Sequence, residues 1–261
     1  MSLNIVISND DGVYAPGINI LFEVLSEIAT VTMVAPLEER STTGHTLTLD
    51  HPLRVVKIRE NVYGCSGYPA DCALMGFAHL VEKDKVDLFI SGINRGANLG
   101  QDIYYSGTVA AAREAAFHDI PSISVSSAMD FASNKKPNDD YFYTAARYIK
   151  KLVEANIHKH IRPMTVINVN VPDILESEIR GVEVTHLGFR KYSENIDKRS
   201  DFRNREYYWI GGNYCGHNND SGSDCSVIDE KKISITPLNL LTQNAEEPNI
   251  WRDFISSINL N

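Results

Sequence analysis

The sequence predicts an α/β fold, a doubly wound and mostly parallel sheet with helices on both faces, followed by a C-terminal β-hairpin region. Two observations support this fold class. Short apolar runs alternate with segments of helical periodicity through the first two thirds of the chain, as in repeated βαβ units. Several of the runs also contain consecutive apolar residues, such as IVI at 5–7 and LFI at 88–90, which is typical of parallel strands buried on both faces.

The first elements form one βαβ unit. The run LNIVIS at 3–8 predicts a buried strand, and the run VTMVA at 31–35 predicts a second one. Between them, apolar residues recur at helical spacing, namely Ile18, Leu21, Phe22, Leu25 and Ile28. This spacing places them on one face of a helix that packs against the sheet.

The same alternation continues as far as Pro172, after a polar loop at 36–46. Pro69 stands in the first turn of its predicted helix, where the missing N–H leaves no hydrogen bond unmade. The predicted elements, in chain order, are a strand at 53–58, a helix at 69–81, a strand at 87–94, a helix at 108–118, a strand at 122–126, a helix opening at Asp139 and a strand at 165–171.

The pattern changes after Asp173. Three short strand-like stretches, VEVTHLG, YYWIGG and KISITPL, are separated by polar segments rich in turn residues, which predicts β-hairpins. The segment NIWRDFISSI at 249–258 predicts a final amphipathic helix. We therefore expect two regions, a sheet domain at 1–174 and a hairpin region with a terminal helix at 175–261.

Composition excludes several functions. The 261 residues contain 25 Lys and Arg against 34 Asp and Glu, a formal net charge of -9, which argues against binding duplex nucleic acid through a broad basic face. No apolar run is long enough to cross a bilayer, and the N-terminus lacks a secretory signal. We expect a cytoplasmic protein whose four cysteines are reduced.

Polar residues follow several of the predicted strands. Asp10 and Asp11 come directly after the first strand, Ser41 lies in the loop after the second, and Asn94 ends the strand at 87–94. Ligands of open parallel sheets bind at the carboxyl ends of the strands, where the strand order reverses. Paired carboxylates with amide and hydroxyl oxygens suit Mg²⁺ or Mn²⁺ better than zinc. The stretch Asn9-Asp10-Asp11-Gly12 is also a common turn sequence.

The stretch at 105–110, YSGTVA, runs into the helix at 108–118. Free backbone N–H groups and hydroxyls at a helix N-terminus form an anion site, for which phosphate is a natural ligand, although a plain N-cap uses the same residues. His45 could reach such a phosphate or simply be exposed. A metal site and an anion site at one edge together indicate phosphoryl transfer or hydrolysis. Phosphate-loop, dinucleotide-binding and nucleophile-elbow motifs are absent from the sequence.

Four blocks in order resemble the SurE family: NDDG after the first strand, VAPxxxRS after the second, SGINxGxNLGxDxxYSGTVAAAxE from 91 to 114, and SITPL at 234–238. The resemblance runs from Asn4 to Pro172 and more thinly to Leu238. Thr42 departs from the pattern, since the family usually has Gly or Ala after the Arg-Ser pair.

The resemblance implies a Rossmann-like, cytoplasmic phosphatase that acts on nucleoside 5'- and 3'-monophosphates, sometimes on short polyphosphate. It also implies one divalent metal ion per subunit, Mg²⁺ or Mn²⁺, and a homodimer or homotetramer that exchanges C-terminal segments. The residues that match the metal ligands of the family are Asp10, Asp11, Ser41 and Asn94, of which Asp10, Asp11 and Asn94 are also catalytic candidates. The residues that match its phosphate-binding segment are Ser106, Gly107 and Thr108.

Two other readings stay open. A haloacid-dehalogenase-like phosphatase also begins with an aspartate at a strand end, but its chemistry requires D-x-D, and position 12 is Gly. A nucleotide-binding module would hold the phosphate without hydrolysing it. The residues also leave open whether an aspartate or a metal-bound water attacks the phosphorus.

Overall fold

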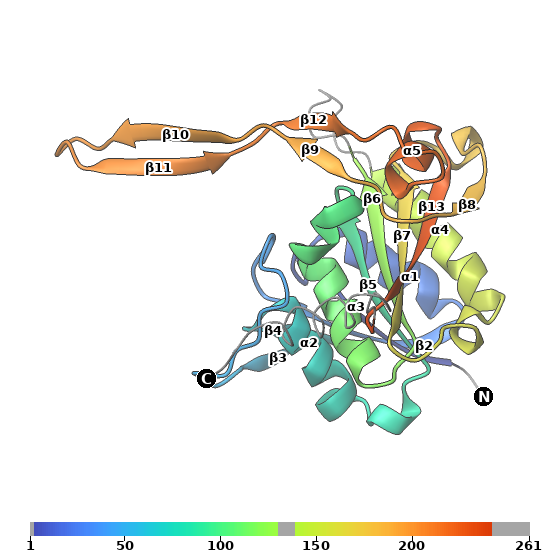
Figure 1. The fold of residues 1–261 in the computed structure, drawn as a ribbon. Coiled ribbons are helices and arrows are strands. Elements are labelled where there is room, and N and C mark those ends of the chain that lie inside the picture. The colour runs from blue at the N-terminus through green and yellow to red at the C-terminus, as the bar shows by residue number, and fades with distance from the viewer. Residues whose placement is uncertain (1–2, 130–138, 242–261) are drawn as a thin grey trace, which may run out of the picture.

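A nine-stranded sheet forms the centre of the computed structural model, which describes residues 3–129 and 139–241 (Figure 1). The strands, in the order in which they lie across the sheet, are β3 (Val55–Arg59), β4 (Val62–Cys65), β2 (Ala29–Pro36), β1 (Leu3–Ser8), β5 (Leu88–Arg95), β6 (Ser122–Ala128), β7 (Thr165–Pro172), β13 (Ile233–Asn239) and β8 (Val182–Val184). All neighbouring pairs are parallel except β3–β4 and β7–β13. The predicted α/β class with a mostly parallel sheet is confirmed.

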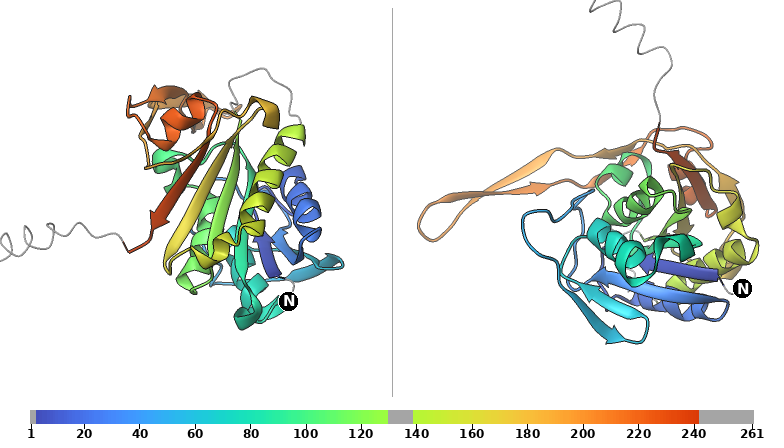
Figure 2. Two further views of the ribbon diagram at one scale, coloured as in Figure 1. Left: turned by 90° about the vertical axis from the view of Figure 1, so that its right-hand side faces the viewer. Right: turned by 90° about the horizontal axis from the view of Figure 1, so that it is seen from below.

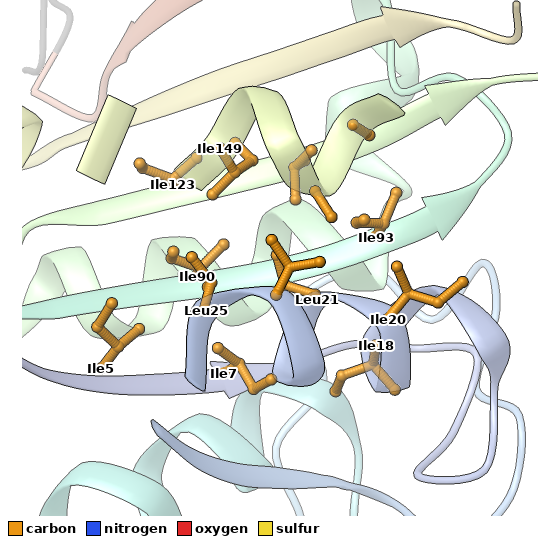
Figure 3. Packing of buried hydrophobic residues seen from close by; sticks show 14 of the residues in the cluster. Ile5, Ile7, Ile18, Ile20, Leu21, Leu25, Ile90, Ile93, Ile123 and Ile149 are labelled. Carbon is orange, nitrogen blue, oxygen red and sulfur yellow. The ribbon is translucent and has the colours of Figure 1, made fainter. Parts of the chain in front are cut away.

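Helices cover both faces of this sheet (Figure 2). Helices α1 (Pro16–Ser26) and α4 (Asp139–Glu154) pack together on one face, and α2 (Pro69–Met75) and α3 (Gly107–Phe117) pack together on the other. Because successive strand residues point to opposite faces, Ile5 and Ile7 join the α1 and α4 core, whereas Val6 joins the α2 and α3 core. Figure 3 shows the first of these cores around Leu21 and Leu25.

The strand order reverses at β1. From β1 the chain runs outward through β2 to β4, and it then returns to β5 on the other side of β1. Ser8, at the end of β1, pairs with Ser91 of β5. The segments that leave the carboxyl ends of these two strands therefore emerge side by side, at the place where open α/β sheets bind ligands.

Several elements differ from their predicted form. The helix predicted at 69–81 is an α-helix only to Met75 and continues as a π-helical turn at Gly76–Leu80. Strand β4 was not predicted, because four residues with a central glycine give too little periodicity. The predicted stretch KISITPL forms most of strand β13 but joins the main sheet antiparallel to β7 and not a hairpin, and the predicted stretch VEVTHLG contributes β8, which pairs with β13 in the same sheet. The sheet therefore includes strands from both regions expected on either side of residue 174.

The predicted hairpin extension forms a long two-stranded projection, which we call the arm (residues 190–217; Figures 1 and 2). Strand β9 (Arg190–Tyr192) pairs with β12 (Tyr214–His217), and beyond them β10 (Asn195–Ser200) pairs with β11 (Glu206–Gly211). Helix α5 (Asp224–Asp229) then leads into β13. The helix expected at 249–258 lies outside the described residues.

Within the part that the structure describes, no helix is both long enough and apolar enough to cross a membrane. The four cysteines, Cys65, Cys72, Cys215 and Cys225, are free thiols.

Candidate active site

The segment after β1 forms a turn that carries two adjacent acidic residues, Asp10 and Asp11. Asn9 and Gly12 exchange two hydrogen bonds, from Asn9 Nδ2 to Gly12 O at 3.0 Å and from Gly12 N to Asn9 Oδ1 at 3.2 Å. Gly12 has a φ of 100°, a conformation that a glycine adopts readily and other residues rarely do. The turn places Asp10 and Asp11 on the wall of a cavity of about 860 Å³, a volume within the usual range for ligand sites.

Burial raises the pKa of both carboxyl groups. Burial, and then the charge of Asp10, raise the pKa of Asp11 to about 7. Burial also raises the pKa of Asp10, although a hydrogen bond from the Thr108 hydroxyl at 2.5 Å opposes the effect. Arg95 N donates to Asp11 Oδ2 at 3.2 Å, and this bond and the charge of Arg95 lower the pKa of Asp11 without offsetting burial and the charge of Asp10. A bound positive ion would stabilise the charged form of both acids further.

The N-terminus of α3 lies against Asp10. Ser106 is the N-cap, and its hydroxyl oxygen accepts a hydrogen bond from Val109 N at 3.0 Å. Gly107 allows this close approach, because a Cβ at that position would lie 2.8 Å from Asp10 Cβ and 3.0 Å from its Oδ2. Ser106 lines the cavity, whereas Thr108 is 0% exposed and directs its hydroxyl to Asp10. Of the three residues in the predicted phosphate segment, two therefore shape the position of Asp10.

Asn94 and Ser41 reach the same cavity from two other strand ends. Asn94 Nδ2 donates to Gly96 O at 2.7 Å, and its Oδ1 accepts no hydrogen bond from residues 3–129 or 139–241. The loop of Ser41 is tied to the first turn because Arg40 N donates to Asp10 O at 2.8 Å. Ser41 Oγ donates to Glu39 Oε1 at 2.7 Å. The structure thus brings Asp10, Asp11, Ser41 and Asn94 to one cavity.

These oxygen atoms fit a hard divalent cation. No His or Cys is among the described residues that line the cavity, and these are the ligands that zinc prefers. The cavity offers two adjacent carboxylates with raised pKa values, one hydroxyl and one amide oxygen. Mg²⁺ and Mn²⁺ take such ligands and complete their shell with water or substrate oxygens.

A buried polar network holds the segment that follows Asn94. Asn98 N donates to Asn170 Oδ1 at 2.9 Å, and Asn98 O accepts from Nδ2 of Asn168 at 2.9 Å and of Asn170 at 3.0 Å. Asn98 Nδ2 donates to Ser126 Oγ at 2.9 Å. Fully paired buried networks of this kind rigidify a segment. Sequence reasoning missed it, although two asparagines two positions apart in the run TVINVNV were a visible signal.

His45 does not face the cavity. Its Nε2 lies 2.7 Å from Glu114 Oε2, and its ring stacks on Phe117 with centroids 5.7 Å apart. Burial alone raises the pKa of Glu114, but the hydrogen bonds and charges of His45 and His118 outweigh it and lower that pKa. The loop is therefore anchored to α3 through His45. Thr42, where the sequence departs from the SurE pattern, has a φ of 59°, a backbone conformation that favours glycine.

The cavity also contains residues that the sequence did not single out. Glu39 lies two positions before Ser41 and adds a third carboxylate to the wall, and Asp102 lies in the 3₁₀ turn at Gly100–Tyr104. Arm residues, among them Tyr192 and Ile210, also line the cavity. Asp102 is the aspartate of the motif that begins at Ser91, and Glu39 is a near neighbour of Ser41. No local pattern marks the arm residues, because they join the site only through contacts between distant parts of the chain.

Comparisons with known proteins find relatives that match most of the chain. The chain matches the family profile described as Survival protein SurE over residues 5–194. It is 43% identical to the 5'-nucleotidase SurE of Geobacter sulfurreducens, over 91% of this chain and 88% of that protein. It is 41% identical to the 5'-nucleotidase SurE of Vibrio cholerae, over 90% of this chain and 91% of that protein.

A solved structure shows the same fold. The crystal structure of the SurE protein from Aquifex aeolicus is similar with a TM-score of 0.82 and 34% sequence identity, and the match covers 97% of this chain and 100% of that chain. The resemblance first indicated by four short motifs therefore extends over nearly the whole chain, and the chain belongs to the SurE family.

Proposed function

We propose that this protein is a 5'-nucleotidase, which hydrolyses nucleoside 5'-monophosphates with the help of one divalent metal ion per subunit, Mg²⁺ or Mn²⁺. The observation that carries the proposal is the pair of adjacent buried carboxylates with raised pKa values, of which Asp10 lies against the N-terminus of α3, on the wall of one cavity. The relatives named 5'-nucleotidase SurE support the choice of substrate. Activity on 3'-monophosphates and on short polyphosphate belongs to the same proposal.

The residues divide into three roles. Asp10, Asp11, Ser41 and Asn94 would hold the ion, and the ion would supply Lewis-acid and template chemistry for the phosphoryl group. Ser106 and the first N–H groups of α3 would bind phosphate oxygens, where fixed donors stabilise developing negative charge.

Gly107 and Thr108 would position Asp10, since the first removes a clash with it and the second donates a hydrogen bond to it. Thr108, whose hydroxyl is already committed to Asp10, is therefore proposed as a positioning residue and not as a phosphate ligand. Asp10, Asp11 and Asn94 would act on the phosphoryl group through the ion that they hold. They are therefore the proposed catalytic residues.

The test measures phosphate release from AMP and from an aryl phosphate, with added Mn²⁺ and with EDTA. We expect release that EDTA abolishes and that Asp11→Asn reduces by at least about a thousandfold, the scale of losing a principal electrostatic group. Asp50→Asn is the matched control, because Asp50 is exposed and lies outside the cavity. Full activity of the Asp11→Asn enzyme would contradict the proposal.

The same assay separates the nucleotide-binding module from the proposed enzyme, because a module would bind AMP tightly and release no phosphate. A haloacid-dehalogenase-like enzyme would need a second carboxylate at position 12, where Gly12 adopts a φ of 100° in the turn. A carboxylate-bearing residue there would be strained, which argues against that chemistry.

We also propose that the protein is cytoplasmic and assembles as a homodimer or homotetramer in which C-terminal segments are exchanged. The arm supports this part, because an isolated two-stranded ladder is marginally stable and this one exposes Phe202, Trp209 and Ile210. Sedimentation of the full chain and of a chain ending at Leu240 tests the exchange. If the truncated chain formed the same oligomer as the full chain, the segment after Leu240 would not be needed for assembly, and this part of the proposal would be wrong.

A further inference from the structure

The loop that carries Ser41 also contacts a buried acid of α3. Nε2 of His45 lies 2.7 Å from Oε2 of Glu114, and Oε1 of Glu114 lies 3.3 Å from Nε2 of His118, one turn later in the chain. The side chain of Glu114 is only 9% exposed and that of His45 is 19% exposed. A glutamate is rarely so buried unless it is paired. We call the contact between His45 and Glu114 the latch.

Hydrogen bonds within the loop make the stretch from Arg40 to Thr46 a short folded unit. Thr43 Oγ1 donates to Arg40 O at 2.9 Å, and Thr46 Oγ1 donates to Thr43 O at 2.6 Å. Threonine hydroxyls that bond to nearby carbonyl groups stabilise turns of this kind. Ser41 and His45 belong to the same unit, so a contact that fixes His45 also restricts Ser41.

Hydrogen bonds tie this unit to the rest of the described structure at its beginning, middle and end. At the beginning Arg40 N donates to Asp10 O at 2.8 Å, and in the middle Gly44 N donates to Tyr105 O at 3.0 Å. The latch lies at the end. The first two contacts are neutral backbone bonds, whereas the latch involves a carboxylate, and hydrogen bonds to charged groups are roughly twice as strong as neutral ones. The latch is therefore the strongest of these ties.

Helix α3 contacts the proposed metal site from both of its sides. At the start of the helix Gly107 packs against Asp10, and seven positions later Glu114 contacts the loop. Residues seven positions apart lie on the same face of a helix, at about 10 Å from each other along the axis. One helix face thus sets the position of Asp10 relative to the loop of Ser41.

We propose that the latch positions Ser41 for the divalent ion. Glu114 holds His45, and His45 holds the folded unit in which Ser41 reaches the wall of the cavity that Asp10 also lines. Neither latch residue is among the described residues that line the cavity, so both are positioning residues. When the latch opens, fewer molecules have Ser41 in place, and the apparent affinity for the ion falls with that fraction. This inference rests on the proposed function, which it deepens by assigning residues outside the cavity that control its metal affinity.

Trypsin gives a direct measure of the latch, because Arg40 is the first Lys or Arg of the sequence. Cleavage after Arg40 produces a fragment of residues 1–40, which mass spectrometry identifies. A native loop must open locally before a protease can cut it. For His45→Ala we expect the rate of cleavage at Arg40 to rise about tenfold, the scale of losing a hydrogen bond to a charged group. His45→Gln, whose amide can donate to Glu114 in place of the ring, should stay close to the wild-type rate.

His118→Ala is the matched control. It removes the other histidine from Glu114 but leaves the loop contact in place, so cleavage at Arg40 should not change. Calorimetric titration of the full chain with Mn²⁺ then connects the latch to the site. For His45→Ala we expect the Kd for Mn²⁺ to rise about three- to tenfold, with kcat for AMP at saturating Mn²⁺ unchanged. His45→Gln and His118→Ala should bind Mn²⁺ as the wild type does.

Several results would overturn the inference. An unchanged rate of cleavage at Arg40 in His45→Ala, or an equal rise in His118→Ala, would show that the latch does not fix the loop. Equal acceleration at Arg40 and at Arg113, which lies within α3, would show a general loss of structure. A faster cut at Arg40 with an unchanged Kd for Mn²⁺ would separate the loop from the metal site. If the wild type bound no Mn²⁺ and released no phosphate, the proposed function would fail, and cleavage at Arg40 would still decide whether the latch fixes the loop.

Discussion

Replacing Asp11 with asparagine should make the metal-free protein more stable while removing its proposed activity. The wild-type carboxylate is held beside Asp10 in a site where burial and the charge of Asp10 raise its pKa from 3.8 to about 7. Above that pH the Asp11 carboxylate is charged although it is buried beside the charge of Asp10, which costs the folded protein free energy. Asparagine has nearly the same shape and carries no charge, so it should remove this cost.

The sign and the pH range follow from the two pKa values. The folded state holds the Asp11 proton more tightly than the unfolded chain does, so the free energy of unfolding falls as the pH rises from about 4 to about 7 and then stays level. The full pKa difference corresponds to about 4 kcal/mol. Asp11 lies on the wall of an open cavity, and solvent screening should reduce the gain to about 1–2 kcal/mol.

Urea unfolding of chelator-treated protein at pH 4, 6 and 8 measures this effect. We expect wild type and Asp11→Asn to have equal free energies of unfolding at pH 4. At pH 8 the variant should be more stable, and its Tm should be higher by about 2–8 °C for a chain of this size. Adding Mn²⁺ should raise the Tm of the wild type by mass action and leave the variant nearly unchanged. The control Asp50→Asn alters an exposed carboxylate and should change stability by less than about 0.5 kcal/mol.

Two results would refute this reasoning. Equal stability of wild type and variant at pH 8 would mean that Asp11 is not held in an unfavourable charged state. An equal Mn²⁺-induced rise in Tm for both proteins would mean that Asp11 does not help to bind the ion.

Three further predictions concern the residues that support the site. Gly107→Ala should reduce phosphatase activity more than about tenfold and destabilise the protein by about 1–3 kcal/mol, because its Cβ would lie 2.8 Å from Asp10 Cβ; steady-state kinetics and urea unfolding measure both effects, and wild-type kinetics would contradict the close packing. Thr108→Val should weaken Mn²⁺ binding in a calorimetric titration by roughly tenfold, the scale of a lost supporting hydrogen bond at a metal site, whereas Thr108→Ser should retain it; equal affinities of the two variants would exclude the hydroxyl contact. Asn170→Ala leaves the buried Asn98 N–H without its acceptor, while Asn98 O keeps its bond from Asn168. It should lower the free energy of unfolding by about 1–3 kcal/mol, so a change below about 0.5 kcal/mol in urea would show that the network is replaceable.

The alternation of strands and helices was predictable because its signal is local. Buried parallel strands such as LNIVIS and DLFISGIN contain three consecutive apolar residues, and the helices between them keep one apolar face. The place of the candidate site was predictable for a related reason, since Asp10, Ser41 and Asn94 each follow a recognisable strand. Short or weakly periodic elements, such as β4, gave no such signal.

Pairing between distant segments was not predictable in the same way. The stretch KISITPL reads as a short strand whether it closes a hairpin or lies antiparallel to β7, and only the packing of the assembled sheet selects the second arrangement. Thr108 matched a phosphate-binding motif, but the fold brings its hydroxyl to Asp10, ninety-eight positions earlier in the chain. His45 likewise turns to Glu114 and not to the cavity.

The sequence by itself therefore determined the α/β class, the order of the βαβ units and the set of polar residues at the strand ends, because residue type and spacing set local backbone preference and burial. The tertiary structure alone decided which of those residues meet, that Gly107 and Thr108 shape the position of Asp10, and that arm residues line the cavity. Those outcomes depend on the summed packing and hydrogen-bond energy of segments far apart in the chain, which no local pattern of residues records.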